Sequence, residues 1–120
     1  MIRYSFLFFV LFLFACERGE CTSIGAEGVR IQIVNKSGQR AQKMILTVPP
    51  LQTRIIDRII ENNAGICIAY KAAGESTYRL LVILENGDTI KSQGSYAEGG
   101  YTITETIRKD SIVTSYNSYY

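Results

Sequence analysis

Apolar and polar residues alternate along most of the chain after residue 28. Val29, Ile31 and Ile33 fall on one face of a segment whose other face carries Arg30 and Gln32. A period of two residues is typical of a half-buried β-strand. The pattern recurs, less strictly, over 43–48, 78–84, 89–93, 101–107 and 112–116, and residues 66–70 form an apolar run typical of a buried strand. The sequence therefore predicts an all-β domain of seven or eight short strands.

A cluster of turn-forming residues lies between the first two predicted strands. Residues 35–38 read Asn-Lys-Ser-Gly, and each of these types except lysine favours turns for a specific physical reason. We therefore predict a β-hairpin in which 29–34 pairs with 43–48, with its loop continuing through 39–42.

The strongest local hairpin signal is the dipeptide Asn86-Gly87, which follows a long apolar stretch. Asn-Gly favours a type I′ turn, because both central residues of that turn need a positive φ. We expect this turn to place Ile90 opposite Ile83.

Residues 51–62 fit two interpretations. Ile55, Ile56, Ile59 and Ile60 fall at helical spacing, which suits a short amphipathic helix. Isoleucine is β-branched, however, and the rest of the domain is consistently β. We favour a strand and keep the short helix as the alternative.

The number and spacing of the strands within residues 28–120 predict an antiparallel β-sandwich of immunoglobulin-like architecture, with a small barrel as second choice. The chain has no tryptophan, and its cysteines are not spaced as in true immunoglobulin domains. The prediction therefore concerns architecture and not ancestry.

The N-terminal segment has the three parts of a signal peptide. Arg3 supplies a positive charge, residues 6–14 are uninterruptedly apolar, and the small residue Ala15 precedes Cys16. The apolar run is shorter than the roughly 20 residues that a membrane-spanning helix needs. We expect this segment to direct export.

The last four residues of that segment, Leu13-Phe14-Ala15-Cys16, resemble the lipobox of bacterial lipoproteins. The resemblance implies cleavage just before Cys16, a diacylglycerol on its thiol and an acyl group such as palmitate on the new amino group. Several chains matter, because one acyl chain gives only marginal membrane binding. Glu17 follows the cysteine, and under the sorting rule of enteric bacteria this implies the outer membrane, facing the periplasm.

The chain then divides into three parts. Residues 1–15 are the expected signal peptide, and 28–120 are the expected β-sandwich domain. Between them, 16–27 are mostly small and polar, with Gly19 and Gly25, and are expected to form a flexible tether from lipid to domain.

Two cysteines are left once Cys16 carries lipid. Cys21 and Cys67 can form a disulfide, which an oxidising compartment such as the periplasm allows. The alternative is a buried Cys67 that packs as a small hydrophobic residue and a free Cys21. The sequence leaves both open.

The composition excludes several kinds of chemistry. There is no histidine, which is the commonest general base and neutral metal ligand. We therefore expect no enzyme, no catalytic residue, no metal site and no cofactor. Without Arg3 the mature chain has 13 − 1 = 12 Lys+Arg against 11 Asp+Glu and no basic stripe, so nucleic acid is not an expected partner.

Glu105 is an acidic residue in a position that the pattern assigns to the core. It is in phase with Tyr101, Ile103 and Ile107. A buried carboxylate would need a partner such as an arginine. We expect instead that a strand end or a bulge turns Glu105 outward.

The best candidate for a recognition loop is the segment 95–101. It places Tyr96, Glu98 and Tyr101 beside two glycines, and loops on rigid β scaffolds often carry function. These side chains suit contact with a sugar or a protein. The plainer interpretation, a glycine-rich connection with tyrosines packing at the sandwich edge, is favoured by the frequency of tyrosine in strands.

Together these features predict a lipid-anchored envelope lipoprotein with a non-enzymatic binding or structural role. Its expected partners are the membrane, through the lipid, and an unidentified protein or glycan. The alternative is a periplasmic inhibitor or immunity-type protein that neutralises a toxin or a hydrolase.

Overall fold

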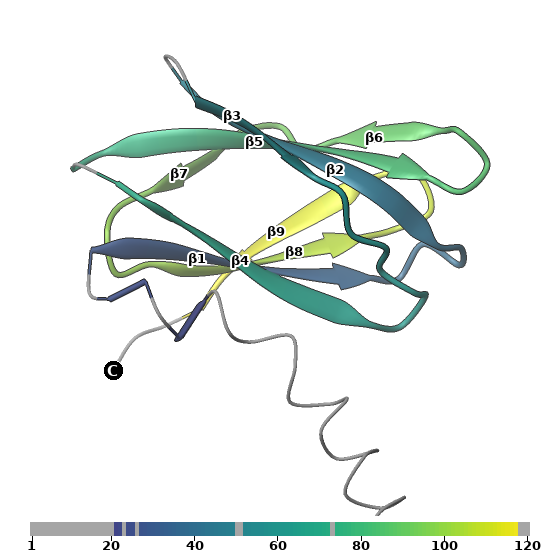
Figure 1. The fold of residues 1–120 in the computed structure, drawn as a ribbon, viewed down its shortest axis with the longest axis horizontal. Helices are drawn as coiled ribbons and strands as arrows, with labels where there is room; N and C mark the ends of the chain where they lie inside the picture. The colour runs from purple at the N-terminus through teal and green to yellow at the C-terminus, as the bar shows by residue number, and fades with distance from the viewer. Residues whose placement is uncertain (1–20, 23, 26, 50–51, 73, 118–120) are drawn as a thin grey trace, which may run out of the picture.

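The computed structural model describes residues 21–22, 24–25, 27–49, 52–72 and 74–117. Two β-sheets pack face to face, one with the order β4-β1-β8-β9 and one with the order β3-β2-β5-β6, in which β7 also pairs with β5 (Figure 1). The strands of the described residues are β1 (Gly28–Asn35), β2 (Ala41–Val48), β3 (Gln52–Ile56), β4 (Gly65–Lys71), β5 (Ser76–Leu84), β6 (Thr89–Lys91), β7 (Ser95–Ala97), β8 (Thr102–Ile107) and β9 (Ile112–Tyr116). The predicted all-β sandwich is confirmed.

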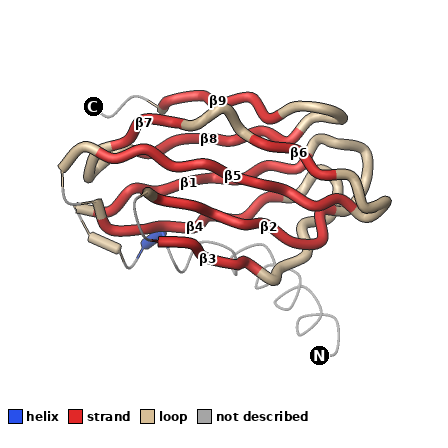
Figure 2. The backbone as a smooth tube through the Cα atoms, turned by 90° about the horizontal axis from the view of Figure 1, so that it is seen from above, coloured by secondary structure: helices blue, strands red, loops and turns tan. Residues whose placement is uncertain are grey.

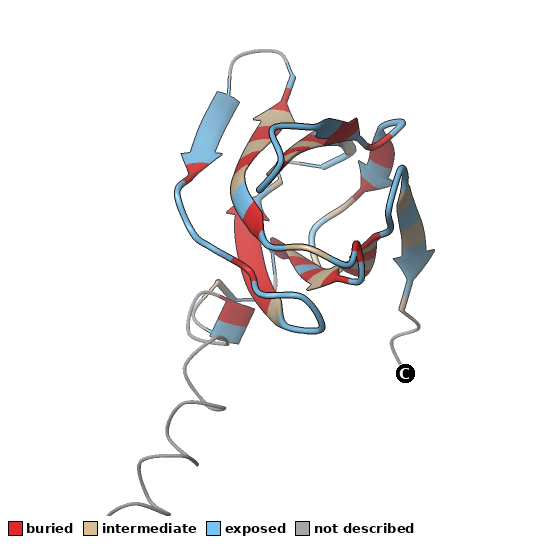
Figure 3. Ribbon diagram, turned by 90° about the vertical axis from the view of Figure 1, so that its right-hand side faces the viewer, coloured by how far each residue is buried: buried red, intermediate tan, exposed pale blue. Residues whose placement is uncertain are grey.

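The alternation read from the sequence sets the two faces of each sheet. Val29, Ile31 and Ile33 of β1 are buried in the main core, as are Met44 and Leu46 of β2. Buried residues therefore alternate with mostly half-buried ones along the central strands, as the red and tan bands of Figure 3 show. The core consists of the facing side chains of the two sheets, which is the usual arrangement of a sandwich.

Within residues 52–62, the predicted strand forms and the helix does not. Residues 52–56 are β3, and Ile60 makes an isolated bridge with Ala41. None of the residues described between 52 and 62 is helical. Ile56 and Ile60 are buried, whereas Ile55 and Ile59 are exposed, so the two pairs of isoleucines divide between the core and the surface.

The predicted hairpin between the first two strands is wrong. β1 lies between β4 and β8, whereas β2 lies between β3 and β5, so residues 36–40 cross from one sheet to the other. The turn residues serve this crossover: the Asn35 side-chain amide is buried and donates to the carbonyl oxygens of Gln39 (2.8 Å) and Ile60 (2.9 Å). Ser37 in turn donates to the Asn35 Oδ1. Alternation of apolar and polar residues predicts which side chains of a strand face the core, but it does not predict which strand lies next to it.

One pair of strands departs from the predicted antiparallel arrangement. β1 and β8 run parallel, with Ile31 beside Ile103, whereas the other pairings are antiparallel. Parallel neighbours cannot be joined by a short turn. The sandwich therefore places an early and a late segment of the chain side by side in the middle of one sheet.

The predicted hairpin at Asn86-Gly87 forms, but through a different turn. Gly87 has a φ of 93°, whereas the φ of Asn86 is not positive, so the turn is not type I′. The Gly87 N–H donates to the carbonyl of Leu84 (2.9 Å), and this bond and the positive φ fit a type I turn followed by a left-handed glycine. The longer loop shifts the register by one residue, so that Ile90 lies opposite Val82 and not Ile83.

The described part of the predicted tether is packed against the domain. Cys21 and Cys67 form a disulfide, with their Cα atoms 5.8 Å apart. Together with Ile24 and Ala69 they make a small cluster separate from the main core, on the outer side of β4. Arg30 fastens the segment further, because its Nε donates to the Cys21 carbonyl and its Nη2 to the Gly25 carbonyl, each at 2.9 Å. Cys21, Ile24 and Gly25 are therefore docked on the domain, whereas residues 16–20 of the expected tether lie outside the described residues.

The expected signal peptide 1–15 and the lipobox cysteine Cys16 lie outside the described residues. Among the residues that are described, no helix is long and apolar enough to cross a membrane.

Candidate recognition surface

The predicted recognition loop lies at one edge of the sandwich, and the structure adds a third tyrosine to it. Tyr96 is in β7, Tyr101 directly precedes β8, and Tyr116 ends β9. The ring centroids of Tyr96 and Tyr101 are 6.1 Å apart, those of Tyr101 and Tyr116 are 6.3 Å apart, and both pairs meet edge to face. We call Tyr96, Glu98, Tyr101 and Tyr116 the tyrosine surface.

Hydrogen bonds fix the rings of this surface. The Tyr96 hydroxyl donates to Glu98 Oε1 at 2.6 Å, and the Tyr116 hydroxyl donates to the Tyr96 carbonyl at 2.9 Å. The bond to Glu98 raises the pKa of Tyr96, because it stabilises the protonated hydroxyl. Tyr96 is 40% exposed and Tyr116 is 51% exposed. The surface is therefore ordered by its own contacts and still accessible to a ligand.

The loop that carries these residues is fastened to the start of β1. The Gly100 N–H donates to the Gly28 carbonyl at 2.9 Å, and a Cβ atom at Gly99 would lie 2.8 Å from the Glu27 carbonyl oxygen. Gly99 is therefore needed for this close approach of two backbones. Gly99 thus holds the loop against the start of β1. The glycine-rich sequence indicated only a flexible connection and did not predict this contact.

Sequence reasoning found three of the four members and missed Tyr116. Tyr116 lies far from the loop in sequence and within a polar C-terminal stretch. It reaches the surface because β9 pairs with β8, which places Tyr116 beside Ile103. Only the pairing of the last strand could have identified it.

Directly inside this edge lies Glu105, whose predicted outward orientation is wrong. The residue has 0% exposure and points into the sandwich. Three hydroxyl groups donate to its carboxylate: Tyr78 to Oε1 (3.1 Å), Ser95 to Oε1 (3.4 Å) and Thr114 to Oε2 (3.1 Å). Neither of the two ion pairs among the described residues includes Glu105. The hydroxyls take the place of the expected arginine, because a buried carboxylate needs several donors.

These hydroxyls also join the two sheets. Ser95 belongs to β7 and Thr114 to β9, and their oxygens are 3.3 Å apart. Burial, and then the charge of Glu105, raises the pKa of Tyr78 well above its usual range. The Tyr78 hydroxyl is therefore protonated at neutral pH and acts as a donor. We call Tyr78, Ser95, Glu105 and Thr114 the buried hydroxyl cluster.

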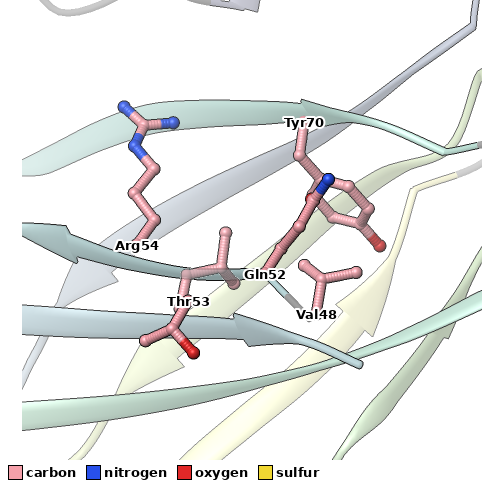
Figure 4. A pocket seen from close by; sticks show the side chains of 6 residues that line it. Val48, Gln52, Thr53, Arg54 and Tyr70 are labelled. Carbon is pink, nitrogen blue, oxygen red and sulfur yellow. The ribbon is translucent and has the colours of Figure 1, made fainter. Parts of the chain in front are cut away.

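The opposite edge of the sandwich is open and contains a cavity of about 380 Å³ (Figure 4). It lies between β3 and β4. Leu46 and Val48 give it apolar walls, and the remaining lining residues are Gln52, Thr53, Arg54 and Tyr70. Arg54 Nη1 reaches across to the Ala69 carbonyl at 3.4 Å. Sequence reasoning missed this cavity because it depends on the separation of two edge strands.

The chemical groups around the tyrosine surface are aromatic rings, hydroxyls and a carboxylate. Ser95 is buried and Thr114 is half-buried, and both donate to the Glu105 carboxylate. Among the residues that the structure covers, no three acidic or cysteine side chains are grouped as a metal site would require. The exposed groups are tyrosine rings, tyrosine hydroxyls and one carboxylate.

Comparison with known proteins supports the fold alone. No family model matches the chain, and no curated protein matches it. The solved structures include a similar one, the NMR structure of a protein from Eubacterium rectale, with a TM-score of 0.59 and 11% sequence identity. The match covers 81% of this chain and 95% of that chain. At this identity the likeness indicates a shared architecture and carries no function.

Proposed function

We propose that this protein is a lipid-anchored, non-enzymatic binding protein of the bacterial cell envelope that contacts an envelope glycan through the tyrosine surface. The observation that carries the proposal is the group of Tyr96, Tyr101 and Tyr116 beside the Glu98 carboxylate, in which Tyr96 and Tyr116 are exposed and Tyr101 is half-buried. The anchor and the ligand are separate parts of the proposal and are tested separately.

Two features support export and anchoring. Residues 13–16 resemble a lipobox, and Cys21 and Cys67 form a disulfide. Disulfides persist in oxidising compartments and are rare in the cytosol, so the bridge favours a location outside the cytoplasm. Export would bring Cys16 to the membrane, where acyl chains would hold the domain.

The chemistry of the tyrosine surface favours a glycan. Tyrosine rings offer flat apolar faces to the C–H groups of a sugar ring, and their hydroxyls offer hydrogen bonds at the rim. The Glu98 carboxylate has further acceptor capacity for sugar hydroxyls beyond its bond from Tyr96. Since Tyr96 and Tyr116 are held by hydrogen bonds before a ligand arrives, little side-chain freedom is lost on binding.

The anchor is tested by metabolic labelling with a fatty-acid analogue. We expect the full-length protein to take up the label and to fractionate with membranes, and Cys16→Ala to do neither. Cys67→Ala serves as a control for the loss of a thiol and should still be labelled. Equal labelling of the parent and Cys16→Ala would overturn the anchor.

The ligand is tested by co-sedimentation of the full-length protein in detergent with protein-free cell-wall sacculi, followed by titration with soluble oligosaccharides. We expect Tyr116→Ala and Glu98→Gln to weaken binding about tenfold, while Thr53→Ala at the opposite edge leaves it unchanged. Absence of glycan binding by the parent protein, or equal binding by Tyr116→Ala, would overturn the glycan proposal and leave the anchor standing.

A further inference from the structure

The outer face of the five-stranded sheet carries a contiguous group of aliphatic side chains. Ile55 of β3, Ile45 of β2 and Leu81 of β5 lie directly opposite one another across three strands. Ile83 follows two positions along β5 on the same face. Side chains opposite each other in a sheet lie within contact distance, so these four residues form one patch, which we call the aliphatic face.

The aliphatic face points away from the core. The residues that alternate with its members, Met44 and Leu46 in β2 and Leu80 and Val82 in β5, are buried between the sheets. Ile55 is 60% exposed, and Ile45, Leu81 and Ile83 are half-buried by their neighbours. An exposed apolar patch on a sheet is typical of an interaction surface, especially where polar residues surround it.

Cationic side chains surround this patch. In the strand register, Lys91 lies opposite Leu81, Lys43 lies opposite Ile83, and Arg79 is two positions from Leu81 on the same face. Lys43 pairs with Asp57 at 3.4 Å. Arg79 and Lys91 form no ion pair within the described part of the chain. The three cations outnumber Asp57 and the exposed Glu85, which lies two positions after Ile83, so the rim keeps a small net positive charge.

The docked residues Cys21, Ile24 and Gly25 lie on the other side of the molecule. Cys21 is bonded to Cys67 on the outer side of β4, and Arg30 of β1 holds its carbonyl, so the chain reaches the domain over the four-stranded sheet. Five residues of extended chain separate Cys16 from Cys21 by at most about 18 Å. We take Cys16 to be lipidated, which rests on the proposed function. The chain is then tied to the bilayer from the side of the four-stranded sheet, and the aliphatic face lies on the opposite layer of the sandwich (Figure 1).

Charge argues against a second copy of this chain as the occupant. Two aliphatic faces brought together would bring two rims of net positive charge into one interface. Like charges across an interface are costly, whereas a negative rim would be complementary. The surface therefore fits a protein with exposed apolar residues surrounded by aspartate and glutamate.

We propose that the aliphatic face, Ile45, Ile55, Leu81 and Ile83 with the rim of Lys43, Arg79 and Lys91, is a docking surface for an acidic protein of the envelope. This surface is distinct from the tyrosine surface. It is also the kind of contact that an inhibitor or immunity-type protein needs, since such a protein acts by covering a protein partner.

The test places a photoreactive amino acid at position 81 or at position 104 of the full-length protein in its own cells. Thr104 lies on the outer side of the four-stranded sheet and serves as the control. We expect position 81, and not 104, to yield one adduct whose protein component is identified by mass spectrometry and carries clustered acidic residues. An adduct with a second copy of this chain, an adduct with lipid, or no adduct at position 81 would overturn the proposal.

The affinity of the surface is measured with the purified full-length protein in detergent. The probe is a synthetic peptide of alternating leucine and glutamate. We expect Leu81→Ser to weaken peptide binding about tenfold, and Lys91→Glu to weaken it and to reduce its salt dependence. Val113→Ser removes an exposed apolar residue elsewhere, and Lys109→Glu reverses a charge in a distant turn, so both should bind as the parent does. A matched leucine–lysine peptide that binds equally well would contradict the acidic partner.

Membrane binding is measured with the same variants and phosphatidylcholine vesicles, with and without phosphatidylglycerol. Because Lys91→Glu changes an exposed side chain, it tests the surface even if Leu81→Ser fails to fold. A loss of vesicle binding in Lys91→Glu would identify anionic lipid as the occupant and overturn the proposal. Failure of Cys16 labelling would remove the anchor, but adducts at position 81 would still report on the docking surface.

Discussion

The two long edges of the sandwich differ, because one is closed by hydrogen bonds between the sheets and the other is open. At one edge, β7 of the five-stranded sheet and β9 of the four-stranded sheet are joined by side-chain hydrogen bonds, from Tyr116 to the Tyr96 carbonyl and between Ser95 and Thr114 (Figure 2). At the other edge, β3 and β4 are separated by the cavity, and the Arg54 guanidinium reaches across it to a carbonyl at 3.4 Å. The first edge is a polar closure, whereas the second is an opening.

The difference shows what each edge strand requires of its sequence. The residues of β9 and β7 include hydroxyls that satisfy the buried Glu105, so changes there disturb the interior. In β3 the first four residues are exposed and only Ile56 is buried, so that strand depends on its pairing with β2. Stability should therefore be concentrated at the β7/β9 edge, with the disulfide supporting β4 from outside.

The largest expected effect comes from removing that external support. Without the disulfide the unfolded chain gains entropy. For a loop of this length we expect the double variant Cys21→Ala/Cys67→Ala to lose about 4 kcal/mol of unfolding free energy in urea. We expect amide exchange to quicken more in β4 than in β9, because the disulfide holds β4. A reductant should destabilise the parent protein and not the double variant. Uniform quickening across both sheets would show that the disulfide acts only through the unfolded chain and gives β4 no local support.

The next effect tests the polar closure from within. Glu105→Ala should cost about 3 kcal/mol, because it leaves buried hydroxyls without an acceptor and creates a void. Glu105→Gln keeps an acceptor and should cost less. The matched control is Glu61→Ala, which removes a carboxylate from an exposed ion pair with Arg40 and should change the urea midpoint little. Similar midpoints for Glu105→Ala and Glu61→Ala would show that the buried cluster is unimportant.

A smaller effect compares one threonine from each edge. Thr114→Val keeps the shape of the side chain but removes its bond to Glu105, and should cost about 1 kcal/mol. Thr53→Val changes an exposed residue beside the cavity and should stay within about 0.5 kcal/mol of the parent. Thermal unfolding of the two variants under one buffer condition measures the difference. The comparison between the edges fails if Thr53→Val is the more damaging change.

The contribution of Tyr78 to stability depends on pH, and the change is expected only in alkali. Since the folded protein raises the pKa of Tyr78 above its unfolded value of about 10, this group's contribution is complete below pH 10. The contribution is then lost as the pH rises toward the folded pKa. We expect unfolding free energies measured above pH 10 to fall less steeply for Tyr78→Phe than for the parent. Parallel pH profiles would contradict the burial of this hydroxyl.

The sequence predicts the class of fold because alternation is a local property. Val29, Ile31 and Ile33 had to share a face, and the two-layer architecture followed. The neighbours of each strand could not be obtained in this way: the turn residues after Asn35 suited a hairpin as well as they suit the observed crossover. Glu105 was misjudged because its three donors come from β5, β7 and β9, which only the folded chain brings together.

For the candidate site, composition located the loop but not its surroundings. Tyr96, Glu98 and Tyr101 lie within six residues of one another, so sequence proximity was enough to group them. Tyr116 joins them through strand pairing, and the aliphatic face requires the register of three strands. Features built from cross-strand neighbours are invisible to a pattern read along the chain.

The parallel pairing of β1 with β8 has a consequence for the order in which the chain can fold. Ile31 lies beside Ile103, which is 103 − 31 = 72 positions later. β1 therefore cannot pair with β8 until most of the chain has been synthesised. Such distant partners make folding slow, because a long loop must close before the contacts form. A nascent chain emerging N-terminus first therefore remains open until its final strands are free, and a fragment that stops before residue 102 lacks one neighbour of its first strand.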